Sequence, residues 1–111
     1  MAIVAVSIAP TGEGPSVSRY VAAALCVLER QDRVRWELNP MFTTLEGEVD
    51  DIFALIRGMQ EAVFAEGAVR VGTVIKIDER RDKEVHMEDK LRAAEAALAA
   101  RGDSMGSSSA D

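Results

Sequence analysis

The stretch that decides the fold is Arg33-Val34-Arg35-Trp36-Glu37-Leu38-Asn39-Pro40-Met41-Phe42-Thr43-Thr44-Leu45-Glu46-Gly47. Its first part, residues 33–38, alternates polar and apolar side chains, which is typical of a strand with one buried face. Asn39-Pro40 then breaks or bends the chain, because proline lacks the amide donor and restricts the residue before it. A second strand pattern follows over residues 41–47. The stretch therefore predicts two consecutive strands joined by a short turn.

Strand and helix patterns alternate on both sides of this pair. An apolar run over 2–9 and an alternating run over 69–77 predict strands, whereas helical spacing of apolar residues covers 16–28, 49–65 and 87–98. The predicted order is strand-helix-strand-strand-helix-strand-helix. Its first six elements predict an α+β, ferredoxin-like βαββαβ fold, with two helices on one face of a four-stranded antiparallel sheet. A C-terminal helix is added to this plan.

Length and composition restrict the class of protein. The 111 residues predict one domain over 1–101, and the Gly/Ser-rich segment 102–111 is expected to be a disordered tail. The net charge of −6 argues against a nucleic-acid partner, which requires a concentrated basic surface. No apolar run reaches the roughly 20 residues of a membrane span. A signal-peptide pattern is also missing and the single Cys26 fits a reducing compartment, so we expect a cytoplasmic protein.

The first predicted strand is apolar on both faces. In an antiparallel sheet with one face open to water, such a strand would alternate cleanly. Its apolar residues are Ala2, Val4, Val6 and Ile8 on one face and Ile3, Ala5 and Ala9 on the other. Because the first two helices cover only one face, the second face is expected to be buried by the third helix or by a second copy of the chain.

The second strand of the deciding pair carries several polar groups. Asn39, Thr43, Thr44 and Glu46 lie beside a thioether and an aromatic ring, the mixture found in pockets for small hydrogen-bonding ligands. The alternative interpretation is an ordinary edge strand in which threonine is favoured by its β-propensity. Strand alternation places Thr43 and Thr44 on opposite faces, so at most one of them faces a given pocket.

No catalytic set is recognisable in the sequence. His86 is the only histidine, and its acidic neighbours Glu84 and Glu88 are interpreted as solvated charges at a helix start rather than as metal ligands. Cys26 lies within an amphipathic helix pattern and is interpreted as a core residue. We therefore expect no catalytic residues, no metal and no cofactor.

Three motifs together resemble those of the small thiamine-binding protein family. They are Ser16–Val21, Glu37–Gly47 and Val74–Lys83, and the resemblance extends in one collinear arrangement over roughly residues 2–100. It implies a ferredoxin-like fold and dimers built on sheet contacts, commonly assembled into tetramers. It also implies binding of thiamine or its hydroxymethylpyrimidine moiety, without an established reaction.

The residues expected to bind the ligand are Asn39, Thr43, Thr44, Glu46 and Lys76. An aminopyrimidine needs an acceptor for its exocyclic amine and partners for its ring nitrogens, and the carboxylate, amide and hydroxyl groups supply both. Glu46 is costly to bury without a partner, which a ligand amine or Lys76 would provide. The expected function is non-catalytic, in vitamin salvage, buffering or delivery.

Two other functions remain open at this point. One is a small dimeric ferredoxin-like enzyme of the isomerase or monooxygenase type, for which only Glu46 or His86 offers a base. The other is a regulatory or assembly subunit with no ligand of its own.

Overall fold

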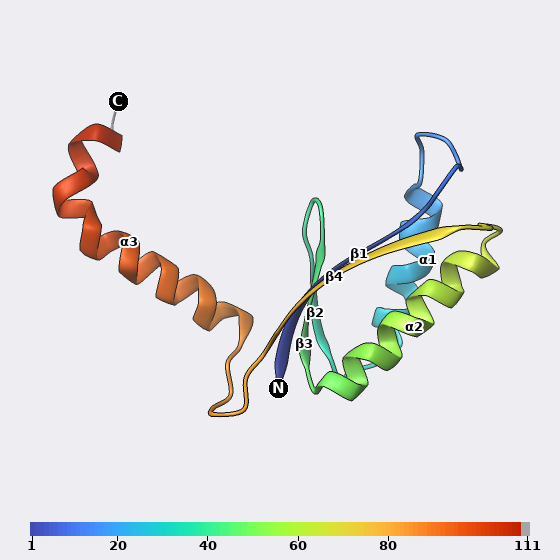
Figure 1. The fold of residues 1–111 in the computed structure, drawn as a ribbon, viewed down its shortest axis with the longest axis horizontal. Helices are drawn as coiled ribbons and strands as arrows, with labels where there is room; N and C mark the ends of the chain where they lie inside the picture. The colour runs from blue at the N-terminus through green and yellow to red at the C-terminus, as the bar shows by residue number, and fades with distance from the viewer. Residues whose placement is uncertain (110–111) are drawn as a thin grey trace.

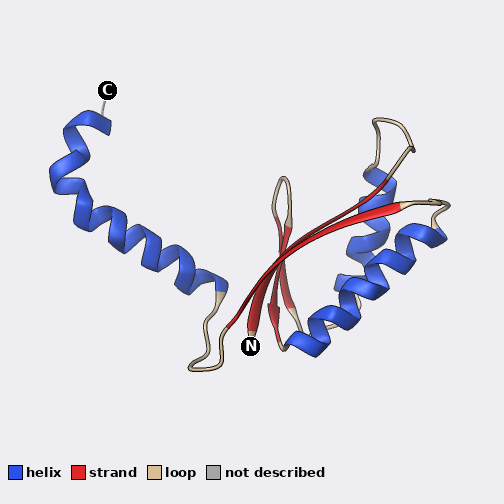
Figure 2. Ribbon diagram, viewed as in Figure 1, coloured by secondary structure: helices blue, strands red, loops and turns tan. Residues whose placement is uncertain are grey.

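The computed structural model describes residues 1–109, and the side chains of residues 1–102 (Figures 1 and 2). The elements in chain order are β1 (Ala2–Pro10), α1 (Ser18–Glu29), β2 (Arg35–Leu38), β3 (Thr43–Gly47), α2 (Val49–Ala65), β4 (Val71–Glu79) and α3 (Met87–Ser109). This order confirms the predicted ferredoxin-like α+β fold with an additional C-terminal helix. The two consecutive strands β2 and β3 are the pair predicted from residues 33–47.

The four strands form one antiparallel sheet in the order β2-β3-β1-β4. The central strand β1 pairs along its whole length with β4, from Ala2 opposite Glu79 to Pro10 opposite Val71. Its pairing with β3 is shorter and ends where Val6 lies opposite Thr43. Helices α1 and α2 lie on one side of the sheet and α3 on the other (Figure 1). We call the side without α1 and α2 the open face.

The core lies between the sheet and the helices α1 and α2. Even-numbered residues of β1 point to the helices, and Val4 is fully buried beside Leu45 of β3. Ile52 of α2 and Leu28 of α1 close this layer from the helix side. Full burial of a side chain of this size stabilises the fold by about 1.5–3 kcal/mol.

The open face carries the odd-numbered residues of β1. Ile3 and Ala5 are half-buried there, and Val74 of β4 is exposed. Helix α3 approaches this face only at its first turn, since Met87 is buried whereas residues 90–101 are exposed. The expectation that the second face of β1 is buried by another copy of the chain stays a prediction.

Several sequence expectations about local structure differ from what is observed. Strand β2 begins at Arg35 rather than at Arg33, and β3 at Thr43 rather than at Met41. The fourth strand begins at Val71 rather than at Val69, which is 86% exposed, because pairing with β1 starts at the Pro10 register. Cys26 is exposed rather than part of the core. Helix α1 buries Tyr20, Ala24 and Leu28, one residue per turn, and Cys26 falls between these positions on another side of the helix.

Helix α3 extends to Ser109 and so enters the segment 102–111, for which the sequence predicts a disordered tail. That expectation stays a prediction, and its last two residues, 110–111, lie outside the described part of the chain. Among the helices of residues 1–109, none combines the length and the apolar character needed to cross a membrane.

Candidate functional site

The turn between β2 and β3 is the local structure that creates a pocket. Residues 39–42 form this turn, and the amide of Asn39 donates a hydrogen bond to the carbonyl of Phe42 at 3.0 Å. Since β3 stops pairing with β1 at Val6, the rest of β1 has a strand neighbour only on the β4 side. The turn and helix α1 border the space that a longer β3 would fill.

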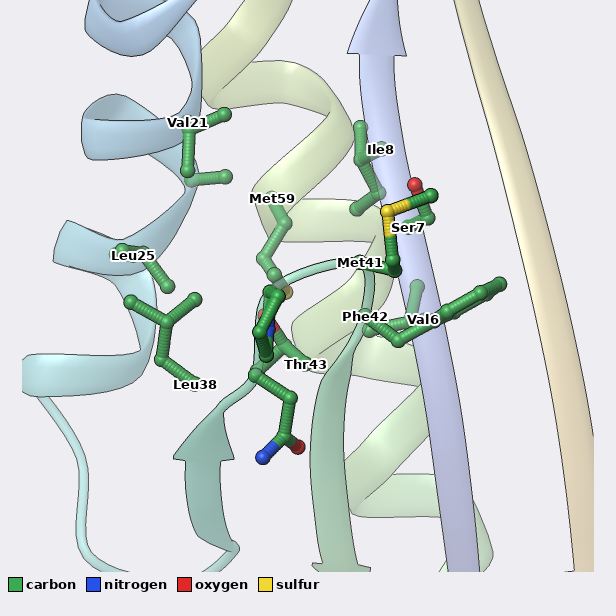
Figure 3. Close-up of a pocket in the computed structure, with 13 residues that line it drawn as sticks. Val6, Ser7, Ile8, Val21, Leu25, Leu38, Met41, Phe42, Thr43 and Met59 are labelled. Carbon is green, nitrogen blue, oxygen red and sulfur yellow. The ribbon is translucent and has the colours of Figure 1, made fainter.

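This space is a cavity of about 110 Å³, which we call the hairpin pocket. It is lined by Val6, Ser7, Ile8, Val21, Ala24, Leu25, Leu38, Asn39, Pro40, Met41, Phe42, Thr43 and Met59. Figure 3 shows Val21 and Leu25 of α1 on one side, Ile8 of β1 on the other and Met59 of α2 behind. Met41 reaches over β1 beside Ser7 in the same view. The walls are therefore mostly apolar and come from both helices and both ends of the turn.

The polar groups of the hairpin pocket are neutral. Its lining residues with polar side chains are Ser7, Asn39 and Thr43, and no charged side chain is among its described lining residues. Thr43 lies opposite Val6 on the helix side of the sheet, whereas Ser7 is an odd-numbered residue of β1 and points to the open face. The hydroxyl of Thr44 donates to Oδ1 of Asn39 at 2.9 Å, which holds the Asn39 side chain at the open-face edge and leaves its amino group for other acceptors. An apolar cavity with the hydroxyl of Thr43 on its helix side and polar groups at its open-face edge suits a flat, neutral ring that carries both donors and acceptors.

A second concave region lies on the open face. It consists of two cavities of about 270 Å³ and 380 Å³ that share Ile3, Ala5 and Lys90, and we call it the open-face groove. Its first part is completed by Glu37, Asn39, Thr44, Met87 and Leu91, and its second part by Lys76, Ile77 and Asp78. The first turn of α3 is thus one wall of this groove, and the sheet is the other.

Glu46 is buried under the first turn of α3, and its carboxylate is hydrogen-bonded by other residues of the chain. Its Oε1 accepts the Met87 amide at 2.7 Å, and its Oε2 lies 2.8 Å from Nδ1 of His86 and 3.0 Å from Nη1 of Arg35. Burial disfavours the charged carboxylate, but the hydrogen bonds from His86 and Met87 and the charge of Arg35 outweigh it. The pKa of Glu46 is therefore lower than its ordinary value.

The structure separates the five residues that the sequence assigns to one site. Asn39 lines both the hairpin pocket and the open-face groove, Thr43 lines only the pocket, and Thr44 lies on the opposite face in the groove and is bonded to Asn39. Lys76 lies in the β4 part of the groove, and Glu46 lines neither cavity. The ligand contacts of these residues stay a prediction. The geometry favours a structural role for Glu46, which has Arg35 and not Lys76 as its basic partner.

Sequence reasoning missed two groups. Ser7 lines the hairpin pocket. The sequence feature that could have indicated it is that Ser7 carries the only hydroxyl in the apolar run 2–9. His86 is not among the predicted ligand-binding residues, but its ring contacts the buried carboxylate of Glu46. Among the described residues, no group of three or more histidine, cysteine, aspartate and glutamate side chains could hold a metal ion.

Comparisons with known proteins agree with the family resemblance and with the fold. The family model described as thiamine-binding protein matches residues 4–95. The UPF0045 protein YqgV of Bacillus subtilis is 45% identical over 97 residues, which is 84% of this chain and 93% of that protein. The crystal structure of the hypothetical protein MJ1052 from Methanocaldococcus jannaschii has a TM-score of 0.76 at 41% identity, covering 84% of this chain and 94% of that one.

A candidate thiamine biosynthesis/salvage protein from Thermotoga maritima shares the fold, with a TM-score of 0.70 at 19% identity over 84% of this chain and 97% of that one.

Proposed function

This chain belongs to the thiamine-binding protein family, and on that premise we propose that it binds the hydroxymethylpyrimidine moiety of thiamine in the hairpin pocket, without catalysing a reaction. The observation that carries the proposal is a mostly apolar cavity that has Thr43 on its helix side and Asn39 at its edge. Both residues belong to the motif on which the resemblance to the family rests. The proposed role is salvage, buffering or delivery of the vitamin.

The chemistry of the pocket supports a pyrimidine. The hydroxyl of Thr43, which shares the helix side of the sheet with Val6, either donates to a ring nitrogen or accepts from the exocyclic amine, and Ser7 and Asn39 offer polar groups at the open-face edge of the pocket. The two ring faces then contact aliphatic and thioether side chains from α1 and α2, among them Leu25 and Met59. An uncharged lining favours a neutral ring over a phosphate, because a buried charge needs a partner of opposite sign.

The size of the pocket supports binding of one ring rather than of the whole vitamin. Its volume of about 110 Å³ is below the range of about 300–1,000 Å³ that encloses drug-sized ligands. The cationic thiazolium would therefore lie outside, beside Leu38 and Met41, which are 55% and 79% exposed. The net charge of −6 attracts such a cation weakly.

Self-association is the second part of the proposal. The open face offers apolar side chains from β1 and β4, and α3 adds the exposed Leu91 and Leu98. In a single chain these side chains are exposed to water. A second copy of the chain could cover them with the same surface, so no additional segment is needed. We propose a homodimer built on the open faces, which pairs further into a tetramer.

Isothermal titration calorimetry tests the proposed ligand. Hydroxymethylpyrimidine and thiamine are titrated into the protein, with thiamine phosphates and the isolated thiazole alcohol as comparisons. We expect one pyrimidine or thiamine per chain and no heat from the thiazole alcohol. Absence of binding by both pyrimidine compounds would favour a subunit without a ligand. Chemical conversion of either compound during the titration would favour the enzyme alternative.

A further inference from the structure

Helix α3 is attached to the rest of the described chain through its first turn. Met87 is 7% exposed, whereas residues 90–101 are exposed and the helix leads away from the sheet (Figure 1). Groups of this turn reach three strands: Glu88 pairs with Arg35 of β2, the Met87 amide donates to Glu46 of β3, and Lys90 pairs with Asp78 of β4. The position of α3 depends on this small set of contacts.

Glu46 is at the centre of the set. The first amides of a helix have no acceptor inside the helix. Normally the residue just before the helix supplies a side-chain oxygen that accepts a hydrogen bond from one of them. In α3 the carboxylate of Glu46, from a different element, accepts the amide of Met87 at 2.7 Å. Asp89 accepts the amide of His86 at 2.9 Å and completes the start of the helix. The helix start is thus fixed to β3 by a buried carboxylate.

His86 is the member of the set whose side chain ordinarily changes charge closest to neutral pH. It is the only histidine of the chain, and its Nδ1 lies 2.8 Å from Oε2 of Glu46. The other charged groups that face this region are Glu84, Glu88 and Asp89 from its own segment and Arg35 from β2. The hydrogen bond with Glu46 outweighs desolvation and holds the pKa of His86 above its ordinary value.

We propose that Glu46 and His86 form a pH-dependent latch that holds the first turn of α3 against the open face of the sheet. The protonated imidazole joins the carboxylate by charge and by hydrogen bond. The neutral imidazole keeps the hydrogen bond only with its proton on Nδ1, and the charge attraction is lost. Docking of α3 is therefore tightest below the pKa of His86 and loosens as the pH rises through it.

The latch also acts on the open-face groove. Met87, Lys90 and Leu91 form the α3 wall of its first part, so a loosened α3 widens or removes that part. The hairpin pocket has no lining residue from α3 and keeps its shape. Raising the pH thus changes one concave surface and leaves the other unchanged.

Electron paramagnetic resonance distance measurement tests the latch. One spin label is attached to the native Cys26 of α1, which is exposed, and the other to an Ala97→Cys variant in α3. The labelled protein is diluted with unlabelled chain, and distances are recorded at about pH 5.5 and about pH 8.5, on either side of the ordinary histidine pKa. We expect a narrow distribution at the lower pH and a broader one at the higher pH.

The His86→Gln variant is the matched control, because glutamine can donate a hydrogen bond but does not titrate in this range. In this variant we expect the same distribution at both pH values. An NMR titration of the single imidazole supplies the midpoint, which should match that of the distance change and move down in Glu46→Gln. The proposal is overturned if the original chain gives one distribution at both pH values, or if His86→Gln keeps the change.

Discussion

Nδ1 of His86 lies 2.8 Å from Oε2 of Glu46, although the two residues are 40 positions apart in the chain. This contact joins the central part of the sheet to the start of α3. It also occupies the carboxylate that the sequence assigns to a ligand. Because Arg35 and the Met87 amide bind the same carboxylate, Glu46 has what a buried charge requires without any ligand.

Substitution of Glu46 is expected to lower stability rather than ligand affinity. Glu46→Gln keeps the shape of the side chain and removes the charge that three donors share. A hydrogen bond to a charged group contributes about 1.5–3 kcal/mol, so the free energy of unfolding in urea should fall by that amount. Glu48→Gln is the matched control, since Glu48 is exposed and its ion pair with the N-terminus spans 3.9 Å. It should change stability by less than about 0.5 kcal/mol.

Stability should depend on pH in a way that follows from the same pair. Folding lowers the pKa of Glu46. Its contribution to the free energy of unfolding is therefore complete above the unfolded-state pKa of about 4.5, and it is lost as the pH falls through the folded-state pKa. The pKa of His86 is raised, so its contribution is complete below about 6.5 and is lost as the pH rises through the folded-state pKa. The pair should therefore stabilise the fold most between about pH 4.5 and about pH 6.5, and urea midpoints measured across this range should show it.

The His86→Gln variant isolates the alkaline part of this profile. Its urea midpoints should lack the decline that the original chain shows as the pH rises from 6.5. An identical decline in both proteins would mean that another group causes it.

Substitution of Thr43 tests the polar edge of the hairpin pocket. Thr43→Val keeps the volume and removes the hydroxyl, so binding of hydroxymethylpyrimidine should weaken by roughly three- to tenfold, the effect of one neutral hydrogen bond. Lys76→Gln is the comparison, because Lys76 lies in the open-face groove and not in the pocket. Calorimetry on both variants decides between the two cavities: a larger loss for Lys76→Gln would place the ligand in the groove.

Lysine substitutions on the two faces of β1 test the proposed assembly. Ala5→Lys puts a charge on the open face and should reduce the mass measured by light scattering from two or four chains of 12.0 kDa toward one, with the fold retained. Val6→Lys puts a charge into the core, where Val6 is 2% exposed, and should prevent folding. A folded original chain that scatters as a monomer at micromolar concentration would contradict the assembly.

Deletion of residues 102–111 should leave melting temperature and oligomer mass unchanged within error. The Gly/Ser-rich composition offers little apolar surface to offset the entropy of ordering. Calorimetric melting and light scattering of the shortened chain measure both quantities. A clear loss of either would show that this segment binds to the rest of the assembly.

Local patterns predicted much of the fold because they record which face of an element is buried. The alternation in 33–38 and 41–47, interrupted at Asn39-Pro40, located β2, the turn and β3. The same alternation placed Thr43 and Thr44 on opposite faces, as the structure shows. The limits of β4 were missed because they depend on pairing with β1, which its own sequence does not encode.

The candidate site was only partly predictable, because it depends on contacts between distant segments. The partners of Glu46 come from β2 and from the start of α3, and no local pattern connects residues 35, 46 and 86. The hairpin pocket exists because β3 is shorter than β1, and this difference appears only when both strands are paired. Ser7 became part of the site for the same reason.

The location of the bound pyrimidine is the most direct test of the central claim. Amide and methyl NMR spectra of the chain are recorded while hydroxymethylpyrimidine is added. The account predicts that the largest shifts occur at Ser7, Thr43 and the methyl groups of Val21 and Leu25, which line the hairpin pocket and not the open-face groove. Shifts confined to Lys76, Lys90 and Leu91 would place the ligand in the open-face groove and contradict the account.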